Sequence, residues 1–294
     1  EYLEAYCNAL ETTLRESFVP EVIHGASNFM NGYAAVNVAR KLGVKSVYEV
    51  RGLWEITRAS RDPFWMGSQH FELLCNLESE VAKHADKVFC ITAALASEMI
   101  SRGVPEEKIS ILPNGVDPGK FPPVQRDIDL ANDLGLHGKT IIGYVGSVVM
   151  YEGLEMLVEA FSLMPPETRT SSALLFVGDG SSMASLRESC DNFGLGPEEV
   201  VFTGRVPHEV VASYYSIIDI APIPRISLPV TEMVSPMKPF EAMSMEKLVI
   251  VSDVAALDEI VIDGENGKVF KKDDVNDLSR ILVESINDPD GSHE

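Results

Sequence analysis

Glu232, Lys238 and Glu241 are charged residues whose types and spacing could bind a phosphorylated sugar. Eight residues lie between the two glutamates, and Lys238 stands directly before Pro239. Proline needs no hydrogen bond in a first helical turn, so we expect a helix to begin there and to continue over residues 240–245. A cation at a helix N-terminus favours phosphate, and a carboxylate accepts hydrogen bonds from hydroxyl groups. The competing interpretation is a pair of solvated surface glutamates.

Polar or glycine-bearing turns follow several apolar runs in the second half of the chain. They are Gly146-Ser147, Gly178-Asp179-Gly180, Gly204-Arg205 and the loop of residues 225–241. Ligands bind beyond the carboxyl ends of the strands in open parallel α/β sheets, so these turns predict one binding rim. No Gly-Lys-Ser/Thr follows Gly146, which excludes a P-loop, and no GxGxxG motif precedes an acidic strand end. A nicotinamide cofactor is therefore disfavoured.

Alternating strands and helices must position these turns. The expected strands cover residues 20–24, 46–50, 87–91, 109–112, 140–145, 173–177, 200–203, 218–222, 248–251 and 269–270. Helical patterns lie between most of them, which is typical of parallel α/β sheets. The proline-rich stretch 118–126 lacks periodicity and predicts a domain boundary. We therefore expect two doubly wound domains, at residues 1–120 and 121–294.

Composition excludes several classes of partner. The chain has 294 residues, 45% of them hydrophobic, and a formal net charge of −21, most of it after residue 120. Such an acidic chain is not suited to nucleic acid, which needs basic surfaces. No apolar run reaches the length of a membrane span, so we expect a cytoplasmic protein with at most peripheral contact with the inner membrane face. The four widely spaced cysteines are expected to be reduced and mostly buried.

The motifs, taken in order, resemble a known family. The second half contains GYVGSVVMYEGLEMLVEAF, FVGDG, VFTGRVPHEVVASYYSIIDIAPIP, SPMKPFEAMSMEKLVIVSDVAALDEIV and DGENGKVF; the first contains EVIHGASNFMNGYAA, VYEVRGLWE and ISILPNGVDPGKF. They resemble the donor and acceptor domains of family 4 glycosyltransferases. The resemblance implies a GT-B fold, in which two Rossmann-like domains face a cleft. It also implies a hexosyltransferase of polysaccharide biosynthesis that retains anomeric configuration and needs no metal or other cofactor.

The resemblance implies roles for residues of the second domain. The donor would be a UDP- or GDP-sugar, and the acceptor a glycan, a lipid-linked sugar or a small molecule. Glu241 would accept hydrogen bonds from the ribose, and Lys238 would be the main cation at the leaving phosphate. Glu232 would lie near the sugar. The remaining residues of the expected donor site are Gly146, Ser147, Gly178, Gly180, Arg205, Val206, Arg225, Val234 and Ser235.

Three residues are candidates on the acceptor side. His24, at the end of the first expected strand, is either a core histidine or a cleft group; in the second case it joins Lys238 and Glu232 as a catalytic candidate. Arg51 follows the next strand and is a candidate for binding an acidic acceptor. Asn114 lies in the turn after the strand at 109–112 and completes this set.

This chain departs from the family pattern in ways that change the expected site. Glu232 and Glu241 are one residue further apart than the family's paired glutamates. Ser147 and Glu152 stand where basic residues are common, so the usual diphosphate clamp is missing and Lys238 and Arg225 must replace it. We also expect that the family's first strand, its glycine-rich loop and its last helix lie outside this chain.

Two other functions remain open from the sequence. A nucleotide-sugar 2-epimerase has a similar two-domain architecture, but its acid–base residues are not evident in residues 1–117. A new epimer formed without acceptor would identify it. A non-catalytic binding or scaffold protein would also account for the missing basic and histidine positions, and measurable donor turnover would exclude that role.

Overall fold

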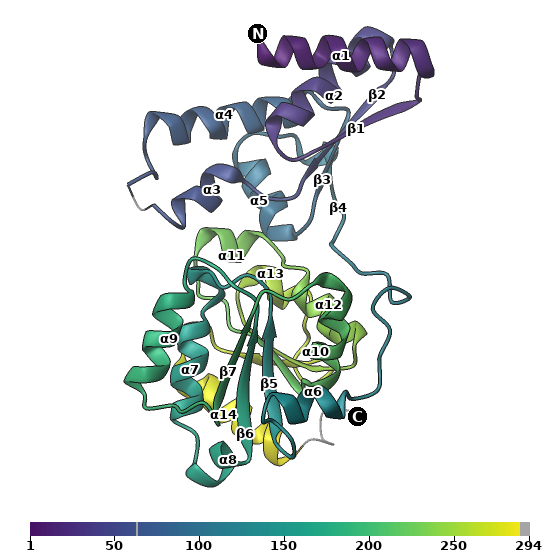
Figure 1. Ribbon diagram of the computed structural model, residues 1–294. Coiled ribbons are helices and arrows are strands. Elements are labelled where there is room, and N and C mark those ends of the chain that lie inside the picture. The colour runs from purple at the N-terminus through teal and green to yellow at the C-terminus, as the bar shows by residue number, and fades with distance from the viewer. Residues whose placement is uncertain (63, 289–294) are drawn as a thin grey trace. The chain divides into compact units, whose positions relative to one another are not determined.

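The computed structural model describes residues 1–62 and 64–288. Two compact units are present (Figure 1). Unit 1 holds residues 1–114 and 228–235, and unit 2 holds residues 115–227 and the chain from Pro236 onward. The segment 228–235, expected in the second domain, groups with unit 1. The expectation for residues 289–294, that the chain ends without a closing helix, lies outside the described residues.

Hydrogen bonds explain why the segment 228–235 groups with unit 1. The Thr92 hydroxyl donates to the Met233 carbonyl oxygen at 2.6 Å, and the Asn114 side-chain amide donates to the Ser235 carbonyl oxygen at 3.0 Å. A short helix, α11 (Pro229–Met233), forms in this segment, with a proline in its first turn. The sequence analysis missed this helix because five residues are too few to show a helical period.

Unit 1 is a parallel sheet of four strands in the order β1-β2-β3-β4. The strands are β1 (Val22–Ala26), β2 (Lys45–Val50), β3 (Lys87–Cys90) and β4 (Ile109–Ile111). The helices of residues 1–114 are α1 (Tyr2–Ser17), α2 (Phe29–Leu42), α3 (Trp54–Ala59), α4 (Gln69–His84), α5 (Ala93–Ser101) and the 3₁₀ turn η1 (Glu106–Lys108). Asn28 caps the start of α2 by accepting from the Met30 N–H, and Gly43 ends it in the left-handed conformation.

Unit 2 is a parallel sheet of six strands in the order β10-β9-β8-β5-β6-β7. The strands are β5 (Thr140–Val145), β6 (Ser172–Val177), β7 (Val200–Gly204), β8 (Ile220–Ile223), β9 (Leu248–Ser252) and β10 (Lys268–Phe270). The helices are α6 (Ile128–Asp133), α7 (Leu154–Ser162), α8 (Pro166–Thr170), α9 (Met183–Asn192), α10 (Val211–Ile217), α12 (Lys238–Ser244), α13 (Ala255–Asp258) and α14 (Val275–Asn287), with the 3₁₀ turns η2 (Met150–Glu152) and η3 (His208–Val210).

Helices cover both faces of the sheet in unit 2 (Figure 1). Alternate residues along a strand point to opposite faces. Ile142 and Phe176 thus join the core beneath α7, α9 and α14, whereas Ile141 and Leu175 join the core beneath α6, α10 and α12. All six residues of β6 are buried, as expected for a central parallel strand.

The structure confirms the predicted fold class, with two Rossmann-like parallel sheets. Each of the ten expected strands is present, with bounds that differ by at most a few residues. The sequence pattern of residues 207–216 predicts a single helix, whereas the structure begins this segment as the 3₁₀ turn η3 and continues it as α10. The helix α8 was not predicted because its five residues carry no period. The four cysteines have free thiols, and Cys7, Cys90 and Cys190 are buried.

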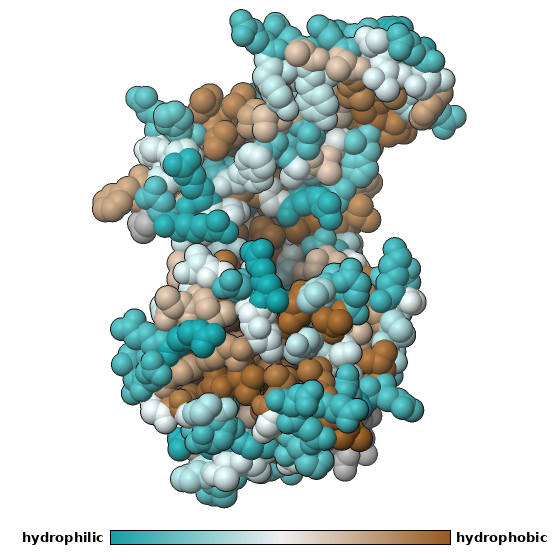
Figure 2. Space-filling model, in the orientation of Figure 1, coloured by the Kyte–Doolittle hydropathy of each residue, from teal (hydrophilic) through white to brown (hydrophobic). Residues whose placement is uncertain are grey.

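On the face drawn in Figure 2, hydrophilic side chains lie along the outline of both units, and hydrophobic side chains form a band across unit 2. In the part of the chain that the structure describes, no helix is both long and apolar enough to cross a lipid bilayer.

Candidate functional site

The strand order of unit 2 places a topological switch point between β5 and β8. The chain builds β5, β6 and β7 toward one edge, and then returns to the other side of β5 for β8, β9 and β10. Ligands of doubly wound sheets bind at the carboxyl ends of the strands at such a point. Gly146 directly follows β5, and Arg225 follows β8 by two residues. These two positions mark where a ligand of unit 2 is expected.

The turns after β5, β6 and β7 form one continuous rim. The Gly146 N–H donates to the Val177 carbonyl oxygen at 2.9 Å, and the Gly178 N–H donates to the Gly204 carbonyl oxygen at 2.9 Å. A Cβ atom at Gly178 would lie 1.9 Å from the Gly146 carbonyl oxygen, and Gly178 has a φ of +139°. A side chain at Gly178 would therefore push these turns apart. Gly180 packs closely in the same way, against the Val148 carbonyl oxygen.

Lys238 lies directly over the end of β5. It is the first residue of α12, and its Cε atom would be 2.4 Å from a Cβ atom at Gly146. Its ammonium nitrogen is 5.3 Å from the centroid of the Tyr144 ring. The absence of a side chain at Gly146 therefore leaves the space that the lysine chain occupies. The structure brings together Gly146 and Lys238, which the sequence analysis placed in one donor site.

Glu152 lies between two cations at this edge. Its Oε1 atom is 2.8 Å from Nη2 of Arg225, and its Oε2 atom is 3.4 Å from Nζ of Lys238. The side chain of Glu152 is 2% exposed, that of Arg225 8% and that of Lys238 19%. A buried charge is costly unless it is paired, and here one carboxylate meets two opposite charges.

The pKa values in this cluster follow from burial and mutual attraction. Burial raises the pKa of Glu152, but the charges of Arg225 and Lys238 outweigh it, so the pKa lies below its usual range. Burial is also the main reason that the pKa of Lys238 is lowered; Glu152 opposes this effect and the positive charge of Arg225 adds to it. The cluster thus consists of an ionised glutamate and two cations.

The sequence pattern does not predict this cluster. Glu152 stands where a basic residue is common, whereas the structure shows it as the partner of both remaining cations. Gly153 is the one residue in this segment whose type indicates a close backbone contact. Its φ is +71°, and an added Cβ atom would lie 1.9 Å from the Pro224 carbonyl oxygen. This close approach brings the residue before Gly153 next to the residue after Pro224. This approach cannot be predicted from residue spacing alone, because Gly153 and Pro224 are 71 positions apart in the sequence.

Glu241 lies one helical turn after Lys238 in α12. Its Oε2 atom accepts a hydrogen bond from the Tyr215 hydroxyl at 3.4 Å, and its side chain is partly buried. Burial and the nearby Glu241 charge raise the pKa of Tyr215, which therefore stays a donor. The second carboxylate oxygen of Glu241 has room for another hydrogen bond.

Three more expected donor residues lie on the same rim. Ser147 is exposed, and its carbonyl oxygen accepts a hydrogen bond from the Tyr144 hydroxyl at 2.9 Å. Arg205 is exposed directly after β7, and Val206 packs against the core beneath α10. All three residues therefore lie at the carboxyl ends of β5 and β7.

Glu232, Val234 and Ser235 group with unit 1, whereas the other expected donor residues group with unit 2. Glu232 lies in α11, and the Ser235 hydroxyl accepts from the Asn114 amide at 3.1 Å. A Cβ atom at Gly52 would lie 3.6 Å from the Val234 side chain. Within unit 1, the segment therefore lies beside the turns after β2 and β4.

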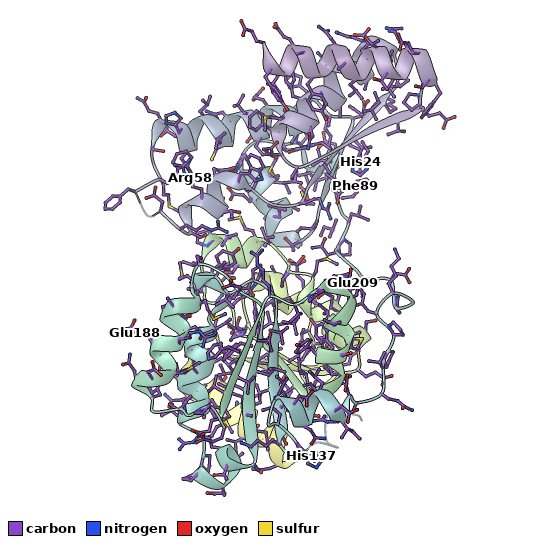
Figure 3. All side chains as sticks on the ribbon, viewed as in Figure 1. His24, Arg58, Phe89, His137, Glu188 and Glu209 are labelled. Carbon is purple, nitrogen blue, oxygen red and sulfur yellow. The ribbon has the colours of Figure 1, made fainter. Side chains whose placement is uncertain are left out.

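His24 and Arg51 share one carboxylate in unit 1. Nε2 of His24 is 3.0 Å from the Glu49 carboxylate, and Nε of Arg51 is 3.5 Å from its other oxygen. The side chains of His24 and Arg51 are 46% and 57% exposed, so His24 is not the core histidine that the sequence left open. Figure 3 shows His24 beside the sheet of unit 1.

Arg58 on α3 contacts Trp65 in the loop that follows this helix. The guanidinium carbon of Arg58 lies 3.6 Å from the centroid of the Trp65 ring, and Trp65 stacks on His70. A cation over a tryptophan ring is a stable contact in its own right. Arg58 is labelled in Figure 3.

A hollow of about 680 Å³ lies at the amino ends of the strands of unit 2, on the side of the sheet away from the switch-point turns. Its lining includes Thr140, Ile220 and Leu248, which begin β5, β8 and β9, together with His137 (labelled in Figure 3). Ligands of this sheet type bind at the carboxyl ends of strands, not at their starts. We therefore place the candidate site at the switch point and not in this hollow.

Two Rossmann-like units, each with a parallel sheet, give this chain the architecture of the GT-B fold class. The chain belongs to the glycosyl transferases group 1 family, whose model matches residues 139–288. A glycosyl transferase 4-like domain matches residues 2–115. These matches confirm the family that the motifs indicated.

Curated relatives are similar to part of this chain. An uncharacterized glycosyltransferase of Methanocaldococcus jannaschii is 24% identical over 206 residues, which are 70% of this chain and 50% of that protein. A GDP-mannose-dependent α-mannosyltransferase of Mycobacterium tuberculosis is 26% identical over 210 residues, which are 69% of this chain and 49% of that protein. The chain spans about half the length of the curated relatives it matches.

Solved structures share the fold over nearly the whole chain. The Anabaena protein HepE, in complex with UDP, has a TM-score of 0.80 and 18% identity, and the match covers 97% of this chain and 73% of that one. Sucrose-phosphate synthase of Thermosynechococcus elongatus has a TM-score of 0.75 and 22% identity, with 99% and 70% covered.

Proposed function

We propose that this chain carries the donor site of a retaining, metal-independent glycosyltransferase. The enzyme would transfer a hexose from a UDP- or GDP-sugar to a glycan, a lipid-linked sugar or a small-molecule acceptor. The observation that carries the proposal is the placement of Lys238 across Gly146 at the switch point of unit 2. A cation there meets the negative charge that a nucleotide sugar brings.

The reaction breaks the bond between the anomeric carbon and the phosphate oxygen, and forms a bond from the same carbon to the acceptor oxygen. Retention means that the acceptor attacks on the face from which the phosphate leaves. The acceptor proton passes to the leaving phosphate oxygen, which balances the step. Negative charge grows on the diphosphate as the bond breaks, so a fixed cation stabilises the transition state more than the bound donor.

Each candidate residue has a role in this scheme. Lys238 neutralises the leaving diphosphate, and the turn at Gly146 and Ser147 provides a close backbone surface for it. Glu241 accepts hydrogen bonds from the ribose hydroxyls with the carboxylate oxygen that Tyr215 does not occupy. Gly178, Gly180, Arg205 and Val206 extend this rim toward the base.

Unit 1 would supply the groups for the acceptor. His24 and Arg51 are exposed beside Glu49, and an acceptor hydroxyl or acidic group is their expected ligand. Glu232 is proposed near the transferred sugar, and Val234 and Ser235 near the diphosphate. Asn114 fixes the segment that carries them through its hydrogen bonds to Ser235.

The comparisons support both guanine and uracil as the base of the donor nucleotide. One relative is named as GDP-mannose-dependent, and one structure of similar fold holds UDP. Titration with both UDP and GDP will decide which nucleotide the donor site binds.

Isothermal titration of the 294-residue chain with UDP and with GDP, in the presence of EDTA, tests the donor site. We expect one of the two to bind, and Glu241→Ala to weaken that binding at least tenfold because the ribose loses its acceptor. Glu188→Ala is a matched control, since Glu188 is an exposed glutamate on α9 (Figure 3). Equal binding by Glu241→Ala and the wild type would refute the ribose role.

A further inference from the structure

Glu152 is a buried carboxylate for which the proposed reaction has no use. It carries the same sign of charge as the phosphates of a donor, and its side chain is almost inaccessible. It is therefore not suited to contact the donor. A buried ion is stable only where its attraction to partner groups offsets the free energy of removing it from water. Its partners are Arg225 and Lys238, and Lys238 is the cation that the proposed function places at the diphosphate.

The three side chains are arranged in order of depth. Lys238 is the most exposed of them, and Arg225 and Glu152 lie further from solvent. Arg225 is fixed from behind, because its carbonyl oxygen accepts a hydrogen bond from the buried Ser252 hydroxyl at 2.7 Å. The end of the cluster that a ligand can reach is therefore the lysine ammonium.

The charge of Lys238 depends on Glu152. Burial and the positive charge of Arg225 both favour the neutral amine and lower the pKa of Lys238. The Glu152 carboxylate opposes them, with a smaller contribution from Glu241 on the same helix. The Tyr144 ring, from β5, lies below the ammonium. Without the Glu152 charge, burial and the charge of Arg225 would lower the pKa of Lys238 further, opposed only by Glu241.

We propose that Glu152 is a positioning residue that holds Lys238 in its charged form over the turn after β5, where the diphosphate of a nucleotide sugar binds. Arg225 keeps Glu152 ionised in turn. This inference rests on the proposed function, because it assigns a purpose to the cluster only if a diphosphate binds at Lys238.

The test is the affinity for UDP and GDP measured by titration calorimetry from pH 6 to pH 10. Glu152→Gln is expected to bind within a few-fold of the wild type at pH 6, because low pH favours the protonated lysine in both. Its affinity should then fall at a pH at least one unit lower than in the wild type, so that it binds about tenfold more weakly at pH values above the wild-type midpoint. Titration of the nucleotide itself is common to all variants and cancels.

Two further variants separate charge from structure. Glu188→Gln removes an exposed carboxylate of unit 2 and should follow the wild-type profile. Arginine stays protonated throughout this range, so Glu152→Gln in a Lys238→Arg background should not shift the profile. A shift of the same size in that background would overturn the inference, because the effect would then come from misplaced structure.

Circular dichroism will show whether Glu152→Gln is folded. If it is not, Glu152→Asp replaces it: the carboxylate is drawn back by one methylene, so a smaller shift in the same direction is expected, again absent with Lys238→Arg. A profile identical to that of the wild type would overturn the inference. If the wild type binds neither nucleotide, the proposed function fails; if it binds but Glu152 variants keep its pH profile, only this inference fails.

Discussion

Glu78 shows at the scale of one residue what burial does to an acid in this fold. It lies on α4 and accepts hydrogen bonds from the Tyr48 hydroxyl and, at 2.9 Å, from the Phe29 N–H. Burial, with a further contribution from the charge of Glu55, raises the pKa of Glu78 to about 7. Glu152 has the opposite shift because two cations face it. The opposite pKa shifts of Glu78 and Glu152 therefore come from the charges next to them, since both side chains are buried.

The raised pKa of Glu78 makes the stability of unit 1 depend on pH. The folded form holds its proton up to about pH 7, whereas the unfolded chain releases it near the usual 4.5. The stabilisation is therefore complete below pH 4.5 and is lost as pH rises toward 7, by roughly 3 kcal/mol. Urea unfolding followed by tryptophan fluorescence measures this, because Trp54 and Trp65 are the two tryptophans of the chain and both lie in unit 1.

Glu78→Gln should remove this component of the pH dependence, since the amide does not ionise. Glu80→Gln, on the same helix but exposed, should leave the wild-type curve unchanged. A wild-type free energy of unfolding that stays constant between pH 5 and pH 7.5 would contradict the assignment.

At the scale of elements, the apolar runs of the sequence were sufficient to predict each strand. A run such as residues 140–145 is buried on both faces, and few structures other than a parallel strand accommodate it. Short helices without a full period were harder, so α11 was missed. The apolar spacing predicts a helix over residues 33–42, whereas α2 already begins at Phe29. The start of α2 depends on the Asn28 cap, and capping is a weaker signal than periodicity.

The candidate site shows the same limit. Gly146, Lys238 and Glu241 were predicted from strand-end turns, because topology alone brings such turns to one edge. The pairing of Glu152 with Arg225 was not predicted, since it depends on backbone approach between distant segments. The assignment of residues 228–235 to unit 1 was missed for a similar reason: it depends on hydrogen bonds from single side chains, such as that of Thr92.

Thr92 joins two elements of unit 1 and gives a prediction at this scale. Its hydroxyl caps α5 by accepting from the Leu95 N–H at 3.0 Å, and donates to the Met233 carbonyl oxygen of α11. Thr92→Val keeps the shape but removes both hydrogen bonds, so unit 1 should lose about 2 kcal/mol of stability. Tryptophan fluorescence during urea unfolding reports the loss.

Thr92→Ser retains the hydroxyl and is the matched control; it should lose clearly less stability than the valine variant. Limited proteolysis gives a second measure, because residues 228–235 should be cut faster in Thr92→Val than in Thr92→Ser. Equal stability and equal cleavage of the two variants would contradict the role given to the hydroxyl.

At the scale of the whole molecule, the proposed donor site is a local exception within an acidic chain. The formal charge is −21, and most of the excess acid lies after residue 120, in the part of the chain that also carries Lys238 and Arg225. A ligand with two negative charges must therefore be attracted by a few fixed cations against an unfavourable long-range field. This is a physical reason for holding the ammonium of Lys238 charged and in place.

The same net charge predicts that salt stabilises the folded protein. Like charges repel one another more strongly in the compact state than in the unfolded chain, and about 150 mM salt screens charges further apart than roughly 8 Å. Surface ion pairs are weakened by salt too, but each contributes little. The midpoint of thermal unfolding at pH 7.5 should therefore rise by several degrees between 10 mM and 150 mM NaCl. Near pH 4.6, the isoelectric point, net repulsion is absent and the rise should disappear. A midpoint that falls with salt at pH 7.5 would mean that paired charges, and not net repulsion, dominate the electrostatics of this protein.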